Sequence, residues 1–390
     1  MKDNRPECRV LVVCNDAEYF LRHRLAVVTH LISLGAEVTV LAGGKRIPAA
    51  LVTGWNYIHV HIERFAFSLI RDMALMVRTS RTIWTLRPDA VHLITLKPAI
   101  FSGLASVASR FVHGSPRRIL ITLPGLGRML SRSNRTDERR YPIASALTRA
   151  ALRFLGRRDY VHFTFESAHD RDFWAKHRVA TDQNSSIIGG AGVDPKLFYP
   201  STSARQTSKT RVLFASRLIR AKGLDVFLSM AHALAKRPDV EFLVAGIPDN
   251  HDPDAIRPDY LQQLEEIHFF GEIKDMPRLL RECDIVCLPT RYGEGIPRIL
   301  IEAAATGLAS IASGHEGCRE IIVNGVTGQI ITGVSDSEMS QKMSAATIGY
   351  LENPDLLKRH KQAAHQLFLS RNFSDSVVIT QLTELLGIHS

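Results

Sequence analysis

The sequence alternates short apolar segments with longer segments that have helical spacing, and this alternation constrains the fold more than any other feature. In the first half, residues 9–14, 90–95 and 118–123 are apolar, and helical segments such as 19–34 and 65–86 lie between them. Strands that are covered by helices on both faces are continuously apolar in this way. The pattern therefore predicts a doubly wound parallel β-sheet of the α/β class.

A second set of alternating segments begins near residue 211, after a polar stretch. The chain has 390 residues, more than the roughly 100–200 residues of a typical domain. We therefore expect two Rossmann-like, doubly wound parallel-sheet domains that face a cleft. The predicted boundaries are 1–197 for the first domain, 198–209 for a linker, 210–372 for the second domain and 373–390 for a helix that returns to the first domain.

Charge and cysteine content narrow the classes of function. The formal net charge of +10 favours an anionic partner. The five cysteines are scattered, which predicts a reducing compartment and no metal. The polar N-terminus does not resemble a signal peptide, and no apolar run approaches the ~18 residues of a membrane span. Nucleic acid is not an expected partner, because no aromatic-interleaved basic stripe is present.

Arginines that recur every fourth residue predict a basic amphipathic helix. Arg149, Arg153 and Arg157 would form its exposed side. Such a helix suits an anionic membrane surface, and it also fits an ordinary half-buried helix with a solvated arginine side. The side opposite the arginines would carry Ile143, Leu147, Ala151, Phe154 and Leu155.

A glycine-rich segment after an expected strand of the second domain is a candidate ligand site. Gly293 and Gly295 flank Glu294, so the backbone there can approach a ligand closely. A helix is expected to begin at Pro297, where unpaired backbone N–H groups favour an anionic or hydroxyl-rich partner. Glu302 follows Glu294 by about two helical turns. From spacing alone, a capped helix with two surface glutamates explains the segment equally well.

Two permanent cations mark the start of the second domain. Arg217 ends its first expected strand, and Lys222 with Gly223 comes just before a helix. Arginine offers a forked contact and lysine a point charge, so the two residues can hold a diphosphate. The alternative is a solvated basic loop.

Together these segments resemble the retaining GT-B glycosyltransferases of family 4. The first half resembles the bacterial branch that builds surface polysaccharides on lipid carriers, so the resemblance covers nearly the whole chain. The segments that carry it are Arg217…Lys222-Gly223, Glu294-x7-Glu302 and 317–328 in the second half, 15–25, 92–98 and 122–127 in the first, and 188–198, which resembles the segment that closes the first domain.

The resemblance implies a role for each motif residue. Arg217 and Lys222 would hold the donor diphosphate and stabilise the leaving charge, and Glu294 would contact the transferred sugar as the third catalytic residue. Glu302 would accept hydrogen bonds from the ribose. The residues implied to bind the donor are Gly223, Gly293, Gly295, Ile296 and Glu302.

No cofactor and no obligatory metal are implied. Asp252-Pro253-Asp254 has the D-x-D spacing of a metal site in another transferase class. Its proline-containing loop predicts a turn instead.

Two positions depart from the family pattern. Asn15-Asp16 stands where many members have a Gly-Gly loop, and Pro124 stands where many have a histidine that contacts the donor sugar. The sugar-contacting residue of the first domain is therefore not identified. Candidates for acceptor or sugar contacts are Asn15, His23 and Lys97.

The resulting prediction is a retaining hexosyl- or N-acetylhexosaminyltransferase. The second domain would bind a nucleotide sugar, UDP-linked by expectation, and the first a lipid-linked saccharide of the undecaprenyl-diphosphate type. The expected location is cytoplasmic, with peripheral attachment to an anionic membrane at the inner face of the plasma membrane. Three alternatives remain: a soluble sugar or sugar-phosphate acceptor, a GT-B nucleotide-sugar epimerase, and a non-catalytic sensor.

Overall fold

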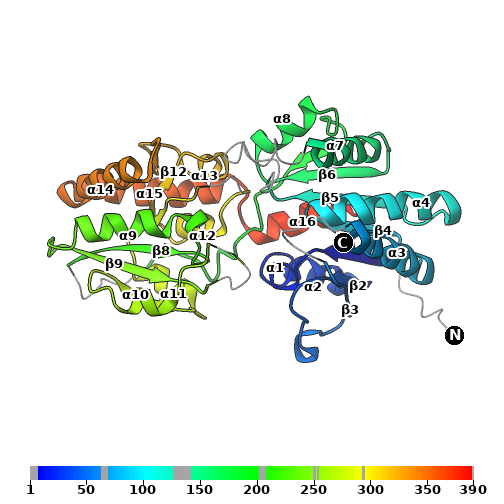
Figure 1. The fold of residues 1–390 in the computed structure, drawn as a ribbon, viewed down its shortest axis with the longest axis horizontal. Helices are drawn as coiled ribbons and strands as arrows, with labels where there is room; N and C mark the ends of the chain where they lie inside the picture. Colours follow the sequence, from blue (N-terminus) through cyan, green and yellow to red (C-terminus); the bar gives the residue numbers. More distant parts are fainter. Residues whose placement is uncertain are drawn as a thin grey trace. The chain divides into compact units, whose positions relative to one another are not determined.

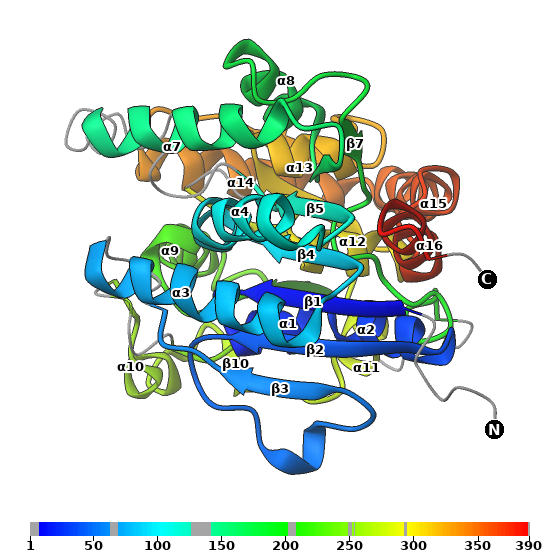
Figure 2. The ribbon, with the colours of Figure 1, turned by 90° about the vertical axis from the view of Figure 1, so that its right-hand side faces the viewer.

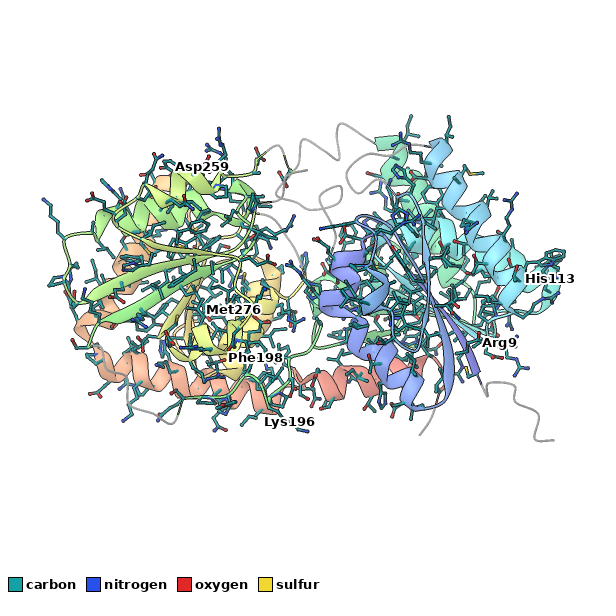
Figure 3. All side chains as sticks on the ribbon, turned by 90° about the horizontal axis from the view of Figure 1, so that it is seen from below. Arg9, His113, Lys196, Phe198, Asp259 and Met276 are labelled. Atoms are coloured by element: carbon teal, nitrogen blue, oxygen red, sulfur yellow. The ribbon has the colours of Figure 1, made fainter. Side chains whose placement is uncertain are left out.

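The computed structural model describes residues 8–62, 69–125, 142–201, 208–248, 252, 254–291 and 295–388. Within these ranges the chain forms two compact units (Figure 1). The first unit comprises the chain up to Gly192 together with the segment from Asp375 onward, and the second comprises Val193–Ser374. Phe198, labelled in Figure 3, is buried in the core of the second unit.

The first unit is built on a seven-stranded parallel sheet with the order β3-β2-β1-β4-β5-β6-β7. The chain winds outward from β1 in one direction and from β4 in the other, so the topological switch point lies between β1 and β4. The strands are β1 (Cys8–Cys14), β2 (Ala36–Ala42), β3 (Asn56–His59), β4 (Ala90–Ile94), β5 (Arg118–Leu123), β6 (Val161–Phe165) and β7 (Ser185–Ile187).

Helices cover both faces of this sheet. α3, α4, α7 and α8 contribute to the core on one face, and α1, α2 and α16 contribute to the core on the other. Figure 2 shows α4 between α3 and α7, with α16 on the opposite side. The helices are α1 (Ala17–His23), α2 (Leu25–Ser33), η1 (Ala49–Leu51), α3 (Leu69–Leu86), η2 (Pro98–Ser102), α4 (Gly103–His113), α7 (Pro142–Gly156), α8 (Ala168–Lys176) and α16 (Asp375–Leu385).

The second unit has a six-stranded parallel sheet with the order β10-β9-β8-β11-β12-β13. Its switch point lies between β8 and β11. The strands are β8 (Thr210–Ala215), β9 (Val240–Ala245), β10 (His268–Gly271), β11 (Ile285–Leu288), β12 (Ala309–Ser313) and β13 (Gly328–Ile331). The helices are η4 (Arg220–Lys222), α9 (Leu224–Ala233), α10 (Pro258–Gln262), α11 (Met276–Arg281), α12 (Arg298–Ala305), α13 (Glu316–Ile321), α14 (Asp336–Glu352) and α15 (Pro354–Ser370).

The two parallel sheets confirm the predicted α/β class with two doubly wound domains. The strands β4 and β5 coincide closely with the apolar segments 90–95 and 118–123 that predicted them, because each is buried along most of its length. None of the helices in the described ranges has the length and apolar character that spanning a bilayer requires.

The structure shows which side of α7 faces the core. An ordinary half-buried helix with a solvated arginine side would bury Ile143 and Leu147, but these side chains are exposed. The core side consists instead of Ser145, Thr148, Leu152 and Leu155, and Arg153 is half-buried with its Nε 3.1 Å from the carbonyl oxygen of His177. The helix has two apolar stripes, and the one that carries small residues is buried. It packs closely against α4, where a Cβ on Gly103 would lie 2.7 Å from Leu155 Cδ1.

Candidate functional site

The carboxyl ends of β8 and β11 are neighbours in the second sheet, so the segments that follow them lie side by side. Arg217 comes two residues after β8, and Lys222 ends the short helix η4. Thr290 and Arg291 follow β11. Ligands of doubly wound sheets bind at this type of switch point, which makes the two segments the candidate site of the second unit.

Gly223 holds the lysine segment against the end of β11. Its φ is +78°, and a Cβ at this position would lie 1.9 Å from the carbonyl oxygen of Pro289. Any other residue would therefore force the two segments apart. Lys222 is only 7% exposed, and Arg217 is half-buried. The predicted cations thus lie in a packed segment, not in a solvated loop.

Arg291 fixes this segment from the other side. Its backbone N–H donates to Ala221 O at 2.8 Å, and its Nη1 donates to Arg220 O. Its guanidinium also makes a forked contact with Asp225, at 2.6 and 2.8 Å. Burial lowers the pKa of Arg291, but hydrogen bonds to Asp225 and Asp336 outweigh that effect and raise it.

The contact with Asp336 ties the same side chain to α14. Arg291 Nε lies 2.9 Å from Asp336 Oδ1, and Nη2 lies 2.7 Å from Oδ2. One arginine therefore joins η4, α9 and α14 directly after β11. Sequence reasoning missed this residue; the signal that could have found it is a cation at a strand end together with acidic residues in the first turns of two helices.

Glu302 lies on α12, which begins at the same edge of the sheet because it follows β11. The side chain is almost completely buried, and its Oε1 accepts from Arg298 Nε at 2.8 Å. Burial raises the pKa of the Glu302 carboxyl, and the positive charge of Arg298 opposes this shift. Gly295 and Ile296 are buried just before the helix. Gly293 and Glu294 lie outside the described residues.

A cavity of about 180 Å³ opens at this carboxyl edge. It lies between the end of β11 and the starts of α9 and α14, next to the contacts of Arg291. Its lining includes Val226, Pro289, Thr290, Arg291, His315 and Asp336.

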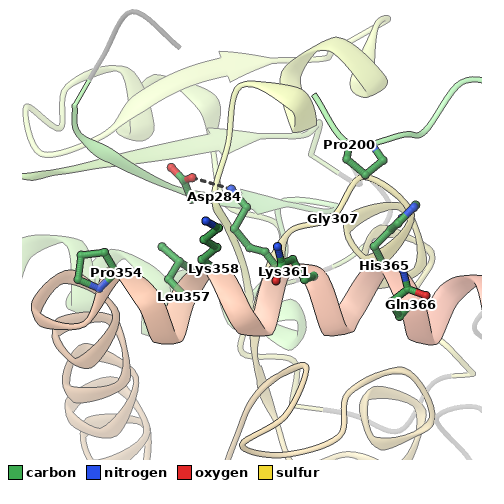
Figure 4. Close-up of a pocket in the computed structure, with 10 residues that line it drawn as sticks. Pro200, Asp284, Gly307, Pro354, Leu357, Lys358, Lys361, His365 and Gln366 are labelled. Carbon is green, nitrogen blue, oxygen red and sulfur yellow. Dashed lines mark hydrogen bonds and ion pairs between the residues drawn. The ribbon is translucent and has the colours of Figure 1, made fainter. Parts of the chain in front are cut away.

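A second cavity, of about 410 Å³, lies at the opposite edge of the same sheet (Figure 4). Asp284 and Gly307 line it, and these residues precede β11 and β12 instead of following them. Lys361 of α15 donates to Asp284 Oδ1 at 2.9 Å across its wall. Because ligands of such sheets bind at the carboxyl ends of strands, this cavity is separate from the candidate site.

The candidates of the first unit lie near the carboxyl ends of β1 and β4. Asn15 directly follows β1, and His23 ends α1 with its ring 4.5 Å from that of Tyr19. Lys97 follows β4 but is buried, and its Nζ lies 2.8 Å from Asp72 Oδ1. An ion pair of this kind holds α3 against the end of β4.

A second buried ion pair, which sequence reasoning also missed, lies between Arg24 and Glu166. Both side chains are almost completely buried, and Arg24 Nη2 lies 3.0 Å from Glu166 Oε1. Arg24 also donates to the carbonyl oxygen of Gly190 at 3.3 Å. The pair connects the start of α2 with the segments that follow β6 and β7.

In the described part of the chain, no group of three or more His, Cys, Asp or Glu residues could hold a metal ion. Asp252 Oδ1 accepts from the backbone N–H of Asp254 at 3.0 Å, the type of contact that stabilises a turn.

Comparison with known proteins finds a family match for part of the second unit. The family model "Glycosyl transferases group 1" matches residues 209–353. The phosphatidyl-myo-inositol mannosyltransferase of Mycolicibacterium smegmatis is 33% identical over 149 residues, 37% of each chain. A diphospho-undecaprenol N-acetylgalactosaminyltransferase of Campylobacter jejuni is 30% identical over 169 residues, 40% of this chain and 44% of that protein. The chain thus matches less than half the length of these relatives.

Solved structures match over nearly the full chain. A glycosyltransferase from Rickettsia africae superposes with a TM-score of 0.72 at 19% identity, covering 98% of both chains. Anabaena HepE, solved in complex with UDP, superposes with a TM-score of 0.74 at 18% identity, covering 97% of this chain and 99% of that one. These likenesses show the fold. The chain therefore has the GT-B fold, and its residues 209–353 match the glycosyl transferases group 1 family model.

Proposed function

We propose that this protein is a retaining glycosyltransferase whose donor site is the carboxyl edge of the second sheet. The observation that carries the proposal is the buried Lys222, held by Gly223 against Pro289 and by Arg291 on the other side. A rigidly held cation in a desolvated edge stabilises a departing phosphate far better than a mobile surface lysine does. The edge also lies within the segment that matches the glycosyltransferase model.

Each residue has a part in the proposed transfer. The bond between the sugar C1 and the donor phosphate oxygen breaks, and the acceptor hydroxyl oxygen forms the new bond to C1 on the same face. The proton of that hydroxyl moves to the departing phosphate oxygen. Arg217 and Lys222 stabilise the diphosphate charge, Glu302 accepts from the ribose hydroxyls, and Glu294 with the N–H groups of Gly295 and Ile296 positions the sugar.

For substrates, we propose a UDP-linked hexose or N-acetylhexosamine and a lipid-linked saccharide acceptor used in surface polysaccharide assembly. Support comes from the relatives, whose names include a phosphatidyl-myo-inositol and a diphospho-undecaprenol acceptor, and from the UDP complex of HepE. Such an acceptor would place the enzyme at the cytoplasmic face of the plasma membrane.

The test is a panel of UDP-, GDP- and ADP-sugars incubated with the purified protein. A donor that binds the native state raises the melting temperature, and transfer or slow hydrolysis identifies a transferase. A product with an altered sugar would identify an epimerase, binding without turnover would identify a sensor, and transfer to a soluble sugar phosphate would replace the lipid acceptor.

Removal of either cation tests the assignment of the site. Lys222→Ala and Arg217→Ala should each lower turnover on the order of 10²–10³-fold, because each removes one charge-stabilising group. Turnover measured with the identified donor, alongside circular dichroism to verify folding, checks this. Near-normal turnover in both variants would refute the proposed site.

A further inference from the structure

The cavity at the amino edge of the second sheet is lined along one side by α15. Its volume is about 410 Å³, within the range of roughly 300–1,000 Å³ that is usual for small-molecule sites. The polar side chains of α15 that line it recur every three or four residues, so they share one side of the helix. They are Lys358, Lys361, Gln362, His365 and Gln366.

The side chains of this cavity give it a positive charge. Lys361 Nζ is paired with Asp284 Oδ1 at 2.9 Å, and Asp284 Oδ2 accepts from the backbone N–H of Arg211 at 3.1 Å. Lys358, by contrast, forms no ion pair with another residue of the described ranges. Two lysines and one aspartate give the lining a formal charge of +1. The cavity therefore favours an anion, and Lys358 is a cation available to bind it.

His365 adds a ring nitrogen to the same side of the cavity. Its Nδ1 lies 2.9 Å from the carbonyl oxygen of Ala305, at the end of α12. A carbonyl oxygen only accepts, so Nδ1 carries a hydrogen and Nε2 is left for a ligand. A neutral ring accepts from a hydroxyl group through Nε2, and a protonated ring donates to an anion. Figure 4 shows His365, Lys358 and Lys361 extending from α15 toward the opposite wall of the cavity.

Apolar side chains form the rest of the lining. Pro200 lies on the wall opposite α15, and Pro354 and Leu357 lie in the first turn of that helix. Gly307 keeps the wall near Pro200 close, because a Cβ there would lie 3.2 Å from Pro200 Cγ. Apolar walls of this kind pack against the carbon skeleton of a ligand, while the polar side chains orient it.

This combination selects the class of ligand. A metal ion does not fit, because the carboxylate of the cavity is already paired with Lys361. A phosphate group fits Lys358 and Lys361, since ammonium groups bind phosphate as point charges. Hydroxyl groups fit Gln362 and Gln366, whose side-chain amides each donate and accept. Both glutamines are exposed and line the cavity beside the lysines.

We propose that this cavity is a second ligand site, which binds a small phosphorylated sugar or polyol with its phosphate at the two lysines and its hydroxyl groups at the glutamine amides. The helix α12, which has eight residues, runs from the carboxyl edge of the sheet to this cavity, a rise of about 12 Å. A nucleotide at the carboxyl edge and a sugar phosphate in the cavity can therefore be bound together. The inference does not rest on the proposed glycosyl transfer, because binding here requires no turnover.

Isothermal titration calorimetry with the full chain tests the class of ligand. The probes are glucose 1-phosphate, glucose 6-phosphate, inorganic phosphate and glucose, each titrated with and without saturating UDP. At least one sugar phosphate should bind about tenfold or more tightly than inorganic phosphate, and glucose should bind more weakly still. UDP should not displace the sugar phosphate. Failure of UDP to bind would count against the proposed donor site alone.

A charge variant of α15 locates the phosphate. Lys358→Gln should weaken binding of the sugar phosphate about tenfold or more, because charge-assisted hydrogen bonds are the strong ones. The matched control is Arg359→Gln, which removes the same charge from the neighbouring exposed position outside the cavity. Both side chains are exposed, so the fold should tolerate either change.

A second pair of substitutions locates the sugar. Gln362→Leu combined with Gln366→Leu should weaken binding of the sugar phosphate about tenfold, since each amide loses hydrogen bonds to hydroxyl groups. The affinity for inorganic phosphate should stay unchanged.

Four outcomes would overturn the proposal. Neither sugar phosphate could bind. Inorganic phosphate could bind as tightly as the sugar phosphates, which would leave no role for a sugar. UDP could displace the sugar phosphate, which would place it at the carboxyl edge instead. Finally, Lys358→Gln could bind the sugar phosphate as tightly as Arg359→Gln does.

Discussion

At the scale of single residues, Arg291 shows how a donor site can depend on a residue that need not touch the donor. It contacts the backbone of η4, Asp225 of α9 and Asp336 of α14. Lys222 ends η4, so its position depends on the same contacts. The guanidinium thus acts on the proposed chemistry through the segment that carries the lysine.

Arg291→Met should therefore lower kcat/KM for the donor by about 10²-fold, because small displacements of a charge-stabilising group cost that much. Arg291→Lys should recover only part of the loss, since lysine cannot make the forked contact. Steady-state kinetics with the identified donor measures both. The matched control is Arg257→Met, which removes an exposed arginine paired with Asp259; unchanged kinetics for Arg291→Met would reject the positioning role.

Glu302→Gln should weaken binding of the nucleotide product about tenfold, because a charged acceptor strengthens hydrogen bonds from ribose hydroxyls. The fold should tolerate the change, since glutamine has the same shape and its amide oxygen can still accept from Arg298 Nε. Isothermal titration calorimetry with UDP provides the measurement. Glu316→Gln on the surface of α13 is the control, and equal affinity in both variants would remove the ribose assignment.

The sequence allowed Arg217, Lys222 and Glu302 to be singled out, because their positions follow from strand ends and helix starts. It did not reveal Arg291, whose carboxylate partners are 66 and 45 residues away in the chain. Only the sheet order, which puts β11 beside β8, brings these residues together.

At the scale of elements, a buried hydrogen-bonded chain crosses the middle of the first sheet. His92 Nε2 on β4 lies 2.8 Å from Thr122 Oγ1 on β5, which lies 2.7 Å from Thr164 Oγ1 on β6. Burial lowers the pKa of His92 to about 3, with a smaller contribution from the charge of Arg24. The histidine is therefore neutral in the fold over the ordinary pH range.

This state of His92 predicts a loss of stability in acid. Below the ordinary pKa of 6.5, the unfolded chain binds a proton that the folded chain excludes, so the free energy of unfolding falls with pH. The contribution should be about 2 kcal/mol between about pH 6.5 and 5, at about 1.4 kcal/mol per unit.

Urea unfolding of the wild type and of His92→Gln at several pH values isolates the effect, because other histidines contribute equally to both proteins. The wild type should lose this stability and the variant should not. His268→Gln, at an exposed position of β10, serves as control. Parallel pH profiles for wild type and His92→Gln would contradict the prediction.

The sequence predicted best those elements whose apolar residues fit only one orientation, such as the buried strands β4 and β5. The orientation of α7 could not be predicted in this way. Its two apolar stripes fit the core equally well by pattern, and the stripe with Ser145 and Thr148 was selected by close packing against α4, which only the tertiary structure defines.

At the scale of the whole molecule, the chain leaves the first unit after Gly192 and returns to it at Asp375. The returning helix α16 contributes Val378 and Leu382 to the core beside α2, and Leu386, which directly follows the helix, joins them. The first unit is therefore completed by the last segment described.

Leu382→Ala should destabilise the first unit by about 2–5 kcal/mol, the usual cost of a large-to-small change in a core. Differential scanning calorimetry should show a lower transition for this unit, while a bound nucleotide still raises the transition of the second. Glu384→Ala, an exposed change on the same helix, is the control. An equal shift of both transitions by Leu382→Ala would contradict the assignment of α16.

Because the chain passes between the two units twice, the second unit is an insertion in the sequence of the first. Val193 N donates to Phe373 O at 3.0 Å, and Val193 is bridged to Ser374, so the ends of the second unit are paired. On the other side of the crossings, a Cβ on Gly192 would lie 2.5 Å from the Cα of Asp375. Exchange of residues 193–374 for the matching segment of a relative would therefore transplant the proposed donor half as a cassette, without cutting a strand or helix of either unit.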